Sequence, residues 1–277
     1  MTDRYAVIGK PISQSKSPLI HSAFAQVTGQ DIDYGKLLGP LGEFAATVDA
    51  FRASGGRGMN VTAPFKLDAF AYATDLAPSA QMAGAVNAMK FEGGKVYAEN
   101  FDGVGLVRDL VHNLACPLKG RRVLILGAGG ATRGALLPLL AEQPAELVIV
   151  NRTVAKAQEL AALAQQHQTG QVPVQGLGYA DLQGQVFDVV LNASSSSLSA
   201  ELPPLPASVF APGCLAYDLT YGKGLTPFLK LAQHAGVTQL ADGVGMLAEQ
   251  AAEAFAWWRG VRPDTAAVIA QLTVPLV

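Results

Sequence analysis

The chain has 277 residues, enough for two modest hydrophobic cores or one large one. Half of its residues are apolar, and 20 Lys and Arg oppose 22 Asp and Glu, which argues against a disordered chain and against a nucleic-acid partner. The two cysteines lack metal-ligand spacing, the first residues do not form a secretory signal, and no apolar run reaches the length of a membrane helix. We therefore expect a cytoplasmic protein with no metal, nucleic-acid or membrane partner.

The first hundred residues alternate short apolar runs with helical patterns. Strands are expected at 5–8, 33–38 and 58–62, and helices at 18–27 and 41–54. Ser17 is the expected N-cap of the first helix, with Pro18 in its first turn. Strands separated by helices predict an α/β sheet.

A second α/β unit follows Gly103, starting with a helix at 104–114 that bridges the two parts. Strands are expected at 122–126, 146–150, 186–191 and 215–219, with helices at 131–141 and 154–168. This rhythm predicts a parallel sheet with right-handed crossovers. The Ala-rich end of the chain predicts two more helices, at about 245–259 and 264–271.

A glycine cluster, Leu126-Gly-Ala-Gly-Gly-Ala-Thr-Arg-Gly134, directly follows one predicted strand and opens a predicted helix. Gly127 suits a tight turn, and Gly129 and Gly130 let the backbone approach a pyrophosphate at the helix N-terminus. Thr132 stands where a strict dinucleotide motif has its third glycine. Taken alone, the cluster also fits a tight turn that binds no ligand.

The residues after the next strand favour NADP over NAD. Asn151, Arg152 and Thr153 begin 24 positions after Gly127, where a site for NAD usually has an acid for the ribose. Arg152 instead offers a guanidinium suited to a 2′-phosphate, and Lys156 adds a second positive charge one turn later. Two cations at a helix N-terminus are unfavourable unless an anion joins them, although a solvated basic pair is the alternative.

Four polar clusters lie in the first part of the chain. They centre on Ser15 and Ser17, on Asn60 to Lys66, on Asn87, and on Asn100 to Gly105, which includes Asp102. Three of these clusters have a simple structural explanation. The serines can cap a helix, most lysines are solvated, and Asp102 can cap the helix that begins near Gly103.

Together, in this order, these clusters resemble the shikimate dehydrogenase family. The resemblance extends to Asn192-Ala-Ser-Ser195, to Tyr217-Asp218, to Tyr221–Leu229 and to Asp242–Gln250, and so covers essentially the whole chain. It implies an N-terminal three-layer α/β substrate domain (1–103, with the C-terminal helices at about 240–277). It also implies a Rossmann-type NADP-binding domain (104–239), and an active site in a cleft between the two domains.

The implied activity is the NADP-dependent, reversible reduction of 3-dehydroshikimate to shikimate, a step toward the aromatic amino acids. By resemblance, Lys66 and Asp102 are the catalytic acid–base pair. The resemblance implies that the substrate is bound by Ser15, Ser17, Asn60, Thr62, Asn87, Phe101, Tyr221 and Gln250. It implies that NADP is bound by Gly127, Ala128, Gly129, Gly130, Ala131, Asn151, Arg152, Thr153, Lys156, Asn192, Ser194, Leu219, Gly243 and Met246. Monomer and homodimer both remain open.

Two residues depart from the family pattern. The family usually has threonine where this chain has Phe101 and Ala88. Loss of a threonine hydroxyl beside Asp102 gives the hypothesis of a weaker or altered enzyme, and the alternative is that the Phe101 ring turns into the core. Two further functions remain open: a quinate/shikimate dehydrogenase with relaxed substrate or cofactor choice, and a non-catalytic NADP-binding regulatory homologue.

Overall fold

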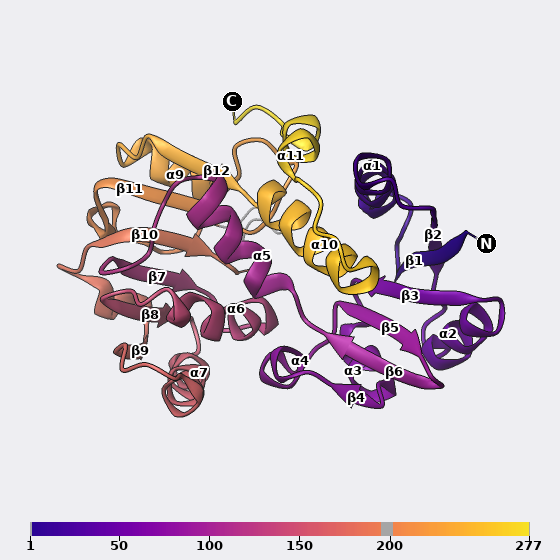
Figure 1. Ribbon diagram of the computed structural model, residues 1–277. Helices are drawn as coiled ribbons and strands as arrows, with labels where there is room; N and C mark the ends of the chain where they lie inside the picture. Colours follow the sequence, from indigo (N-terminus) through magenta and orange to yellow (C-terminus); the bar gives the residue numbers. More distant parts are fainter. Residues whose placement is uncertain (1, 195–201, 277) are drawn as a thin grey trace. The chain divides into compact units, whose positions relative to one another are not determined.

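The computed structural model describes residues 2–194 and 202–276 and shows an α/β protein with two sheets (Figure 1). The backbone contacts divide the chain into two compact units. Unit 1 comprises Met1–Gly105 and Ala248–Ala270, and unit 2 comprises Leu106–Leu247 and Gln271–Val277. No helix in the described part of the chain is both long enough and apolar enough to cross a membrane.

Unit 1 contains a mixed six-stranded sheet in the order β2-β1-β3-β5-β6-β4. Its strands are β1 (Asp3–Gly9), β2 (Ile32–Leu38), β3 (Gly56–Val61), β4 (Asp75–Leu76), β5 (Ala88–Glu92) and β6 (Lys95–Glu99). β1 runs parallel to β2 and β3, whereas β5 runs antiparallel to β3 and β6. Gly93 and Gly94 join β5 to β6 with φ of 58° and 80°, the positive values that a tight hairpin turn needs.

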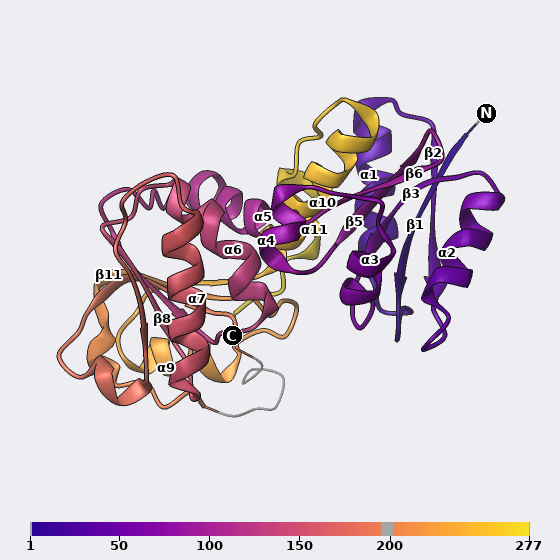
Figure 2. The ribbon, with the colours of Figure 1, turned by 90° about the horizontal axis from the view of Figure 1, so that it is seen from below.

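Alternate residues of β1 enter the cores on the two faces of this sheet. Ala6 and Ile8 pack with α2, while Tyr5 and Val7 pack with α10. Figure 2 shows these two helices on opposite sides of β1. The helices that contribute to unit 1 are α1 (Ser17–Thr28), α2 (Phe44–Ala53), α3 (Lys66–Tyr72), α4 (Pro78–Ala83) and parts of α5 (Asp102–Arg108), α10 (Val244–Arg259) and α11 (Ala266–Leu272).

Unit 2 contains a fully parallel sheet in the order β12-β11-β10-β7-β8-β9. Its strands are β7 (Arg122–Leu126), β8 (Glu146–Val150), β9 (Val174–Leu177), β10 (Phe187–Asn192), β11 (Phe210–Asp218) and β12 (Gln239–Asp242). Its other elements are α6 (Gly130–Ala141), α7 (Val154–His167), α9 (Pro227–His234), a π-helical segment η1 (Asp109–Asn113) and the 3₁₀ turns η2 (Tyr179–Leu182) and η3 (Ala207–Val209). The chain leaves β7 toward β8 on one side and returns to β10 on the other, so the sheet has the switch point of a Rossmann fold beside β7.

The predicted α/β class with a Rossmann-type unit is confirmed, and one predicted cap is wrong. Ser17 is the first residue of α1, and Lys16 is the N-cap, without a side-chain hydrogen bond. The hydroxyl at this helix start belongs to Ser15, whose Oγ accepts the Ser17 N–H at 3.3 Å. The prediction placed the helix start one residue late, a common error at helix ends.

Candidate active site

An ion pair between Lys66 and Asp102 lies at the centre of the polar cluster in unit 1. Lys66 begins α3 and Asp102 begins α5, and Lys66 Nζ lies 2.5 Å from Asp102 Oδ2. The Lys66 and Asp102 side chains are 34% and 18% exposed, so both are reachable yet partly shielded from water. With one N–H occupied by Asp102, the ammonium keeps donors for another oxygen.

The second oxygen of Asp102 is also bound. Asn87 Nδ2 donates to Asp102 Oδ1 at 2.8 Å and contacts Gln250 Oε1 at 3.4 Å. Asp102 is the first residue of α5 rather than the residue before the helix. At this helix start, Asn100 Oδ1 accepts the Asp102 N–H at 3.1 Å.

Buried hydrogen bonds connect this ion pair to β2 and β3. Asn60 Nδ2 donates to the Asn87 carbonyl at 3.3 Å, and the Tyr34 hydroxyl donates to Asn60 Oδ1 at 2.6 Å. Asn60 and Asn87 are buried, so their bonded amides hold fixed orientations. The structure thus brings together Asn60, Lys66, Asn87, Asp102 and Gln250, all within unit 1.

The predicted serine pair joins the same network. Ser15 Oγ donates to Ser17 Oγ at 3.3 Å, and the Ser17 hydroxyl hydrogen-bonds Tyr34. Thr62 follows β3 directly, and its methyl lies close enough to Gly9 that a Cβ there would come within 2.5 Å of it. The β1 and β3 strands are parallel, so the segments that follow them lie at the same edge of the sheet.

The Phe101 ring packs against Trp257. The two rings meet edge to face with centroids 5.8 Å apart, and Phe101 is a partly buried member of the core beside α10. Its backbone N–H donates to Asn87 Oδ1 at 2.9 Å. The residue therefore helps to orient Asn87 through its backbone, while its ring has an apolar partner within unit 1.

Behind the network lies a buried histidine that the sequence analysis gave no role. The His21 ring stacks on Tyr34 with centroids 4.2 Å apart and an interplanar angle of 7°. Burial lowers the pKa of His21 to about 3, against a smaller opposing effect of nearby Asn60, so the imidazole is neutral at pH 7. The sequence signal was present, because His21 lies only four positions after Ser17 in the same predicted helix.

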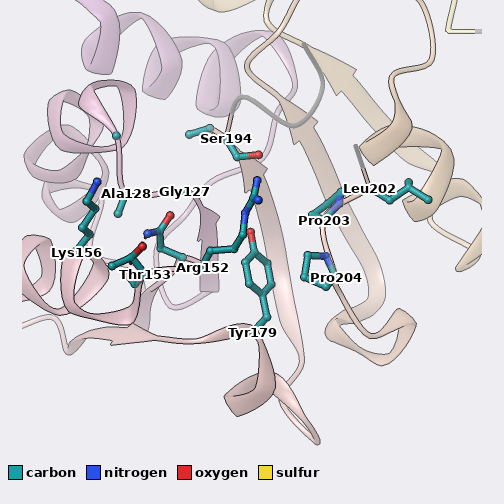
Figure 3. Close-up of a pocket in the computed structure, with 13 residues that line it drawn as sticks. Gly127, Ala128, Arg152, Thr153, Lys156, Tyr179, Ser194, Leu202, Pro203 and Pro204 are labelled. Atoms are coloured by element: carbon teal, nitrogen blue, oxygen red, sulfur yellow. Dashed lines mark hydrogen bonds between the residues drawn. The ribbon is translucent and has the colours of Figure 1, made fainter. Parts of the chain in front are cut away.

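Unit 2 carries a cavity of about 820 Å³ at the carboxyl ends of its central strands (Figure 3). Among the predicted cofactor residues, the cavity is lined by Gly127, Ala128, Gly129, Asn151, Arg152, Thr153, Lys156 and Ser194. Gly127 has a φ of 98°, which favours glycine. No described atom lies within 4 Å of a Cβ built on Gly129 or Gly130, so the backbone is open to a ligand there.

Basic side chains make this cavity suited to an anion. Arg152 and Lys156 are exposed, and the first turn of α7 contains no acid. Figure 3 shows the Tyr179 side chain beside Arg152. Burial raises the pKa of Tyr179, and the positive charge of Arg152 partly opposes this rise. An open glycine turn beside two cations fits a dinucleotide that carries an extra phosphate, which is NADP.

Some predicted cofactor residues do not line this cavity: Gly130, Ala131, Asn192, Leu219, Gly243 and Met246. Asn192 is fully buried, and its Oδ1 accepts hydrogen bonds from the N–H and hydroxyl of Ser194. It therefore supports a lining residue. Ser195, quoted for the resemblance, lies outside the described residues.

Several lining residues were not predicted from the sequence: Tyr179, Ala193, Leu202, Pro203 and Pro204. Tyr179 was missed because its strand was missed. β9 is only four residues long and contains Gly176, so it gave no clear apolar run. Once β9 is known, Tyr179 follows it at the same sheet edge as the glycine turn, which is the place for a ligand contact.

Comparison with known proteins gives matches in both units of the chain. The chain matches a model for the shikimate dehydrogenase substrate binding domain over residues 7–89, one for shikimate / quinate 5-dehydrogenase over 109–200, and one for the shikimate 5′-dehydrogenase C-terminal domain over 243–273. It is 57% identical to a shikimate dehydrogenase (NADP(+)) of Chromobacterium violaceum, with 96% of each chain covered.

The chain is also similar to solved structures of other proteins. The chain is similar to an Ael1 enzyme from Pseudomonas putida, with a TM-score of 0.94 and 59% identity over 100% of both chains. It is also similar to shikimate 5-dehydrogenase from Thermus thermophilus in complex with NADP(H) and shikimate, with a TM-score of 0.84 and 30% identity, covering 97% of this chain and 98% of the other. The chain belongs to the shikimate dehydrogenase family.

Proposed function

We propose that this protein catalyses the NADP-dependent, reversible reduction of 3-dehydroshikimate to shikimate, with Lys66 and Asp102 as the catalytic pair. The observation that carries the proposal is the Lys66–Asp102 ion pair, joined to Asn87 and Gln250 by hydrogen bonds. The relatives named above as shikimate dehydrogenases support the same substrate and cofactor.

NADPH, when bound, would supply the hydride that reduces the ketone carbon. As the carbonyl oxygen gains negative charge, the Lys66 ammonium donates a hydrogen bond and then a proton to it. Asp102 keeps the ammonium aimed at that oxygen, because its other oxygen is already fixed by Asn87. In the opposite direction, neutral Lys66 accepts the proton of the substrate hydroxyl.

The remaining residues of unit 1 bind the substrate in this proposal. The amides of Asn60, Asn87 and Gln250 offer donors and acceptors to ring hydroxyls, and Ser15 and Ser17 hold the carboxylate. Thr62 and Phe101 complete the set in unit 1, and Tyr221 of unit 2 also contacts the substrate in this proposal. Unit 1 is accordingly the substrate domain and unit 2 the NADP domain.

The cavity in unit 2 holds the adenosine half of NADP. Arg152 and Lys156 bind the 2′-phosphate, and the turn at Gly127, Ala128, Gly129, Gly130 and Ala131 binds the pyrophosphate at the start of α6. Asn151, Thr153, Asn192, Ser194 and Leu219 complete this half, and Gly243 and Met246 border the nicotinamide. A cytoplasmic location and a monomeric or homodimeric state remain predictions.

A matrix of kcat/KM values for shikimate and quinate, each with NADP and NAD, tests the proposal. The highest value is expected for shikimate with NADP. A higher value for quinate or for NAD contradicts the proposal and favours the relaxed quinate/shikimate dehydrogenase. Undetectable turnover together with intact NADP binding contradicts it in favour of the non-catalytic homologue.

A further inference from the structure

A buried acid in unit 2 has no part in the proposed chemistry. Asp109 is 3% exposed and lies in the π-helical segment η1 that follows α5. The Tyr217 hydroxyl donates a hydrogen bond to Asp109 Oδ2 at 2.8 Å, and Asn113 Nδ2 donates one to Asp109 Oδ1 at 2.9 Å. Tyr217 is fully buried in β11. A buried carboxylate is costly unless it is compensated in this way, so its presence calls for a reason.

The carboxylate of Asp109 touches the first turn of α10. A Cβ built on Gly245 would lie 1.8 Å from Asp109 Oδ1, so only glycine fits at this position. The backbone of Met246 hydrogen-bonds the Tyr217 hydroxyl. Tyr217 therefore links the Asp109 carboxylate to the Met246 peptide, and the negative charge of Asp109 lies at the positive end of the helix dipole.

Asp242 also holds this turn through hydrogen bonds. Asp242 Oδ1 accepts the Val244 N–H at 3.2 Å, and Asp242 Oδ2 accepts the Gly222 N–H at 2.9 Å. The Gly243 N–H donates to the Thr220 carbonyl at 3.2 Å. The segment from Gly243 to Met246 is thus held by two acids, Asp109 and Asp242.

We propose that Asp109 and Tyr217 are positioning residues that fix the Gly243–Met246 turn for contact with the nicotinamide ring. This inference rests on the proposed function, which places Gly243 and Met246 beside that ring. Hydride transfer depends steeply on the distance and angle between donor and acceptor. Because the Gly243–Met246 turn is held by a buried carboxylate, it keeps the nicotinamide ring in place. Binding of the adenosine half of the cofactor depends instead on the cavity around Arg152.

The Tyr217→Phe variant tests this division between the two halves of the cofactor. It keeps the buried ring and removes the hydroxyl between Asp109 and Met246. The Kd for NADPH is expected to rise about tenfold, as for the loss of one hydrogen bond at the upper end of its range, and kcat is expected to fall. The Kd for 2′,5′-ADP, which has the 2′-phosphate and adenine but no nicotinamide, is expected to stay within about twofold.

Asn113→Ala is the matched control, because it removes a hydrogen bond to the other oxygen of the same carboxylate. It is expected to change neither Kd by more than about twofold. Thermal melting shows whether each variant is folded. If Tyr217→Phe does not fold, the same measurements are made on Asp109→Asn.

Equal weakening of NADPH and 2′,5′-ADP binding, or no change in either, overturns the inference. The two binding constants need no turnover. A wild-type enzyme that is inactive on shikimate therefore contradicts the proposed function, while the ratio of the two constants still decides the role of Asp109 and Tyr217.

Discussion

The candidate sites of the two units are built in opposite ways. In unit 1, side chains hydrogen-bond one another, so that Lys66, Asp102, Asn87 and Gln250 hold their positions before a ligand arrives. In unit 2, an open glycine turn and exposed cations surround a cavity. A network of bonded side chains fixes atoms for chemistry, whereas a backbone cradle with flexible charges provides affinity. Changes in the network of unit 1 should therefore affect kcat, and changes in the cavity of unit 2 should affect KM.

The largest effect is expected for Lys66→Met. This change keeps most of the side-chain volume and removes the proton donor, so kcat should fall by about 10³-fold, within the range for loss of a general acid. Steady-state kinetics with shikimate and NADP measure this effect. Lys90→Met is the control, because Lys90 pairs with Glu92 outside the network and should leave kcat unchanged. A fall of less than tenfold in Lys66→Met would remove Lys66 from the catalytic role.

Unit 1 should also be the acid-sensitive unit, because of His21. Its folded pKa of about 3 lies below the ordinary value of 6.5, so the unfolded chain takes up a proton first as the pH falls. The stability that neutral His21 supports is complete above pH 6.5 and is lost progressively between pH 6.5 and 3. The loss at pH 5 is about 2 kcal/mol.

Urea unfolding of the wild type and of His21→Phe at pH 7 and pH 5 measures this contribution. The wild type should lose about 2 kcal/mol more than the variant between the two pH values. In unit 2, burial raises the pKa of Cys116, Tyr179, Cys214, Tyr217 and Tyr221, so these groups do not titrate in this range. Identical losses in both proteins would show that His21 does not set the acid sensitivity.

A smaller effect is expected for Arg152→Gln in unit 2. Loss of a charge-assisted hydrogen bond to the 2′-phosphate should raise KM for NADP about tenfold, while KM for NAD, which lacks that phosphate, should change little. The ratio of the two KM values is the measurement. Lys119→Gln removes a positive charge from unit 2 away from the cavity lining and should leave the ratio unchanged. If Arg152→Gln lowers kcat while the ratio of the two KM values stays constant, Arg152 does not act through cofactor affinity, and the comparison drawn between the two units is wrong.

The smallest effect on activity is expected for Phe101→Thr, despite its place beside Asp102. The ring packs on Trp257, so its removal should cost about 1–2 kcal/mol of stability and change kcat/KM for shikimate less than threefold. Thermal melting and steady-state kinetics measure the two quantities. A gain in kcat/KM above tenfold would instead support the hypothesis that Phe101 slows turnover.

Much of the fold was predictable because its strands are buried runs of branched residues. The strands β7, β8 and β10 have such sequences and were predicted within a residue or two. The hairpin of β5 and β6 was missed, because Lys90, Tyr97 and the charged ends break the apolar pattern. The Gly93-Gly94 pair was the local signal that could have located it.

For the candidate site, the sequence supplied the residue types and the structure supplied their connections. Lys66 and Asp102 are 36 positions apart, and no spacing rule indicates that their side chains meet. Tyr34 and His21 were overlooked because an aromatic residue in a strand and a histidine in a helix look like ordinary core residues. Only tertiary packing shows that Tyr34 lies between Ser17 and Asn60.

The discontinuous make-up of unit 1 has a consequence for synthesis on the ribosome. Trp258 stacks on Tyr5 with centroids 4.7 Å apart, and its indole N–H donates to the Met89 carbonyl at 3.0 Å. These contacts close the core on one face of the first sheet, yet residue 258 is translated after every strand of unit 2. During synthesis, one face of the N-terminal sheet therefore lacks α10 until the second sheet has been translated. An isolated 1–105 fragment should aggregate, and a circular permutant that joins 248–270 to the N-terminus should fold earlier.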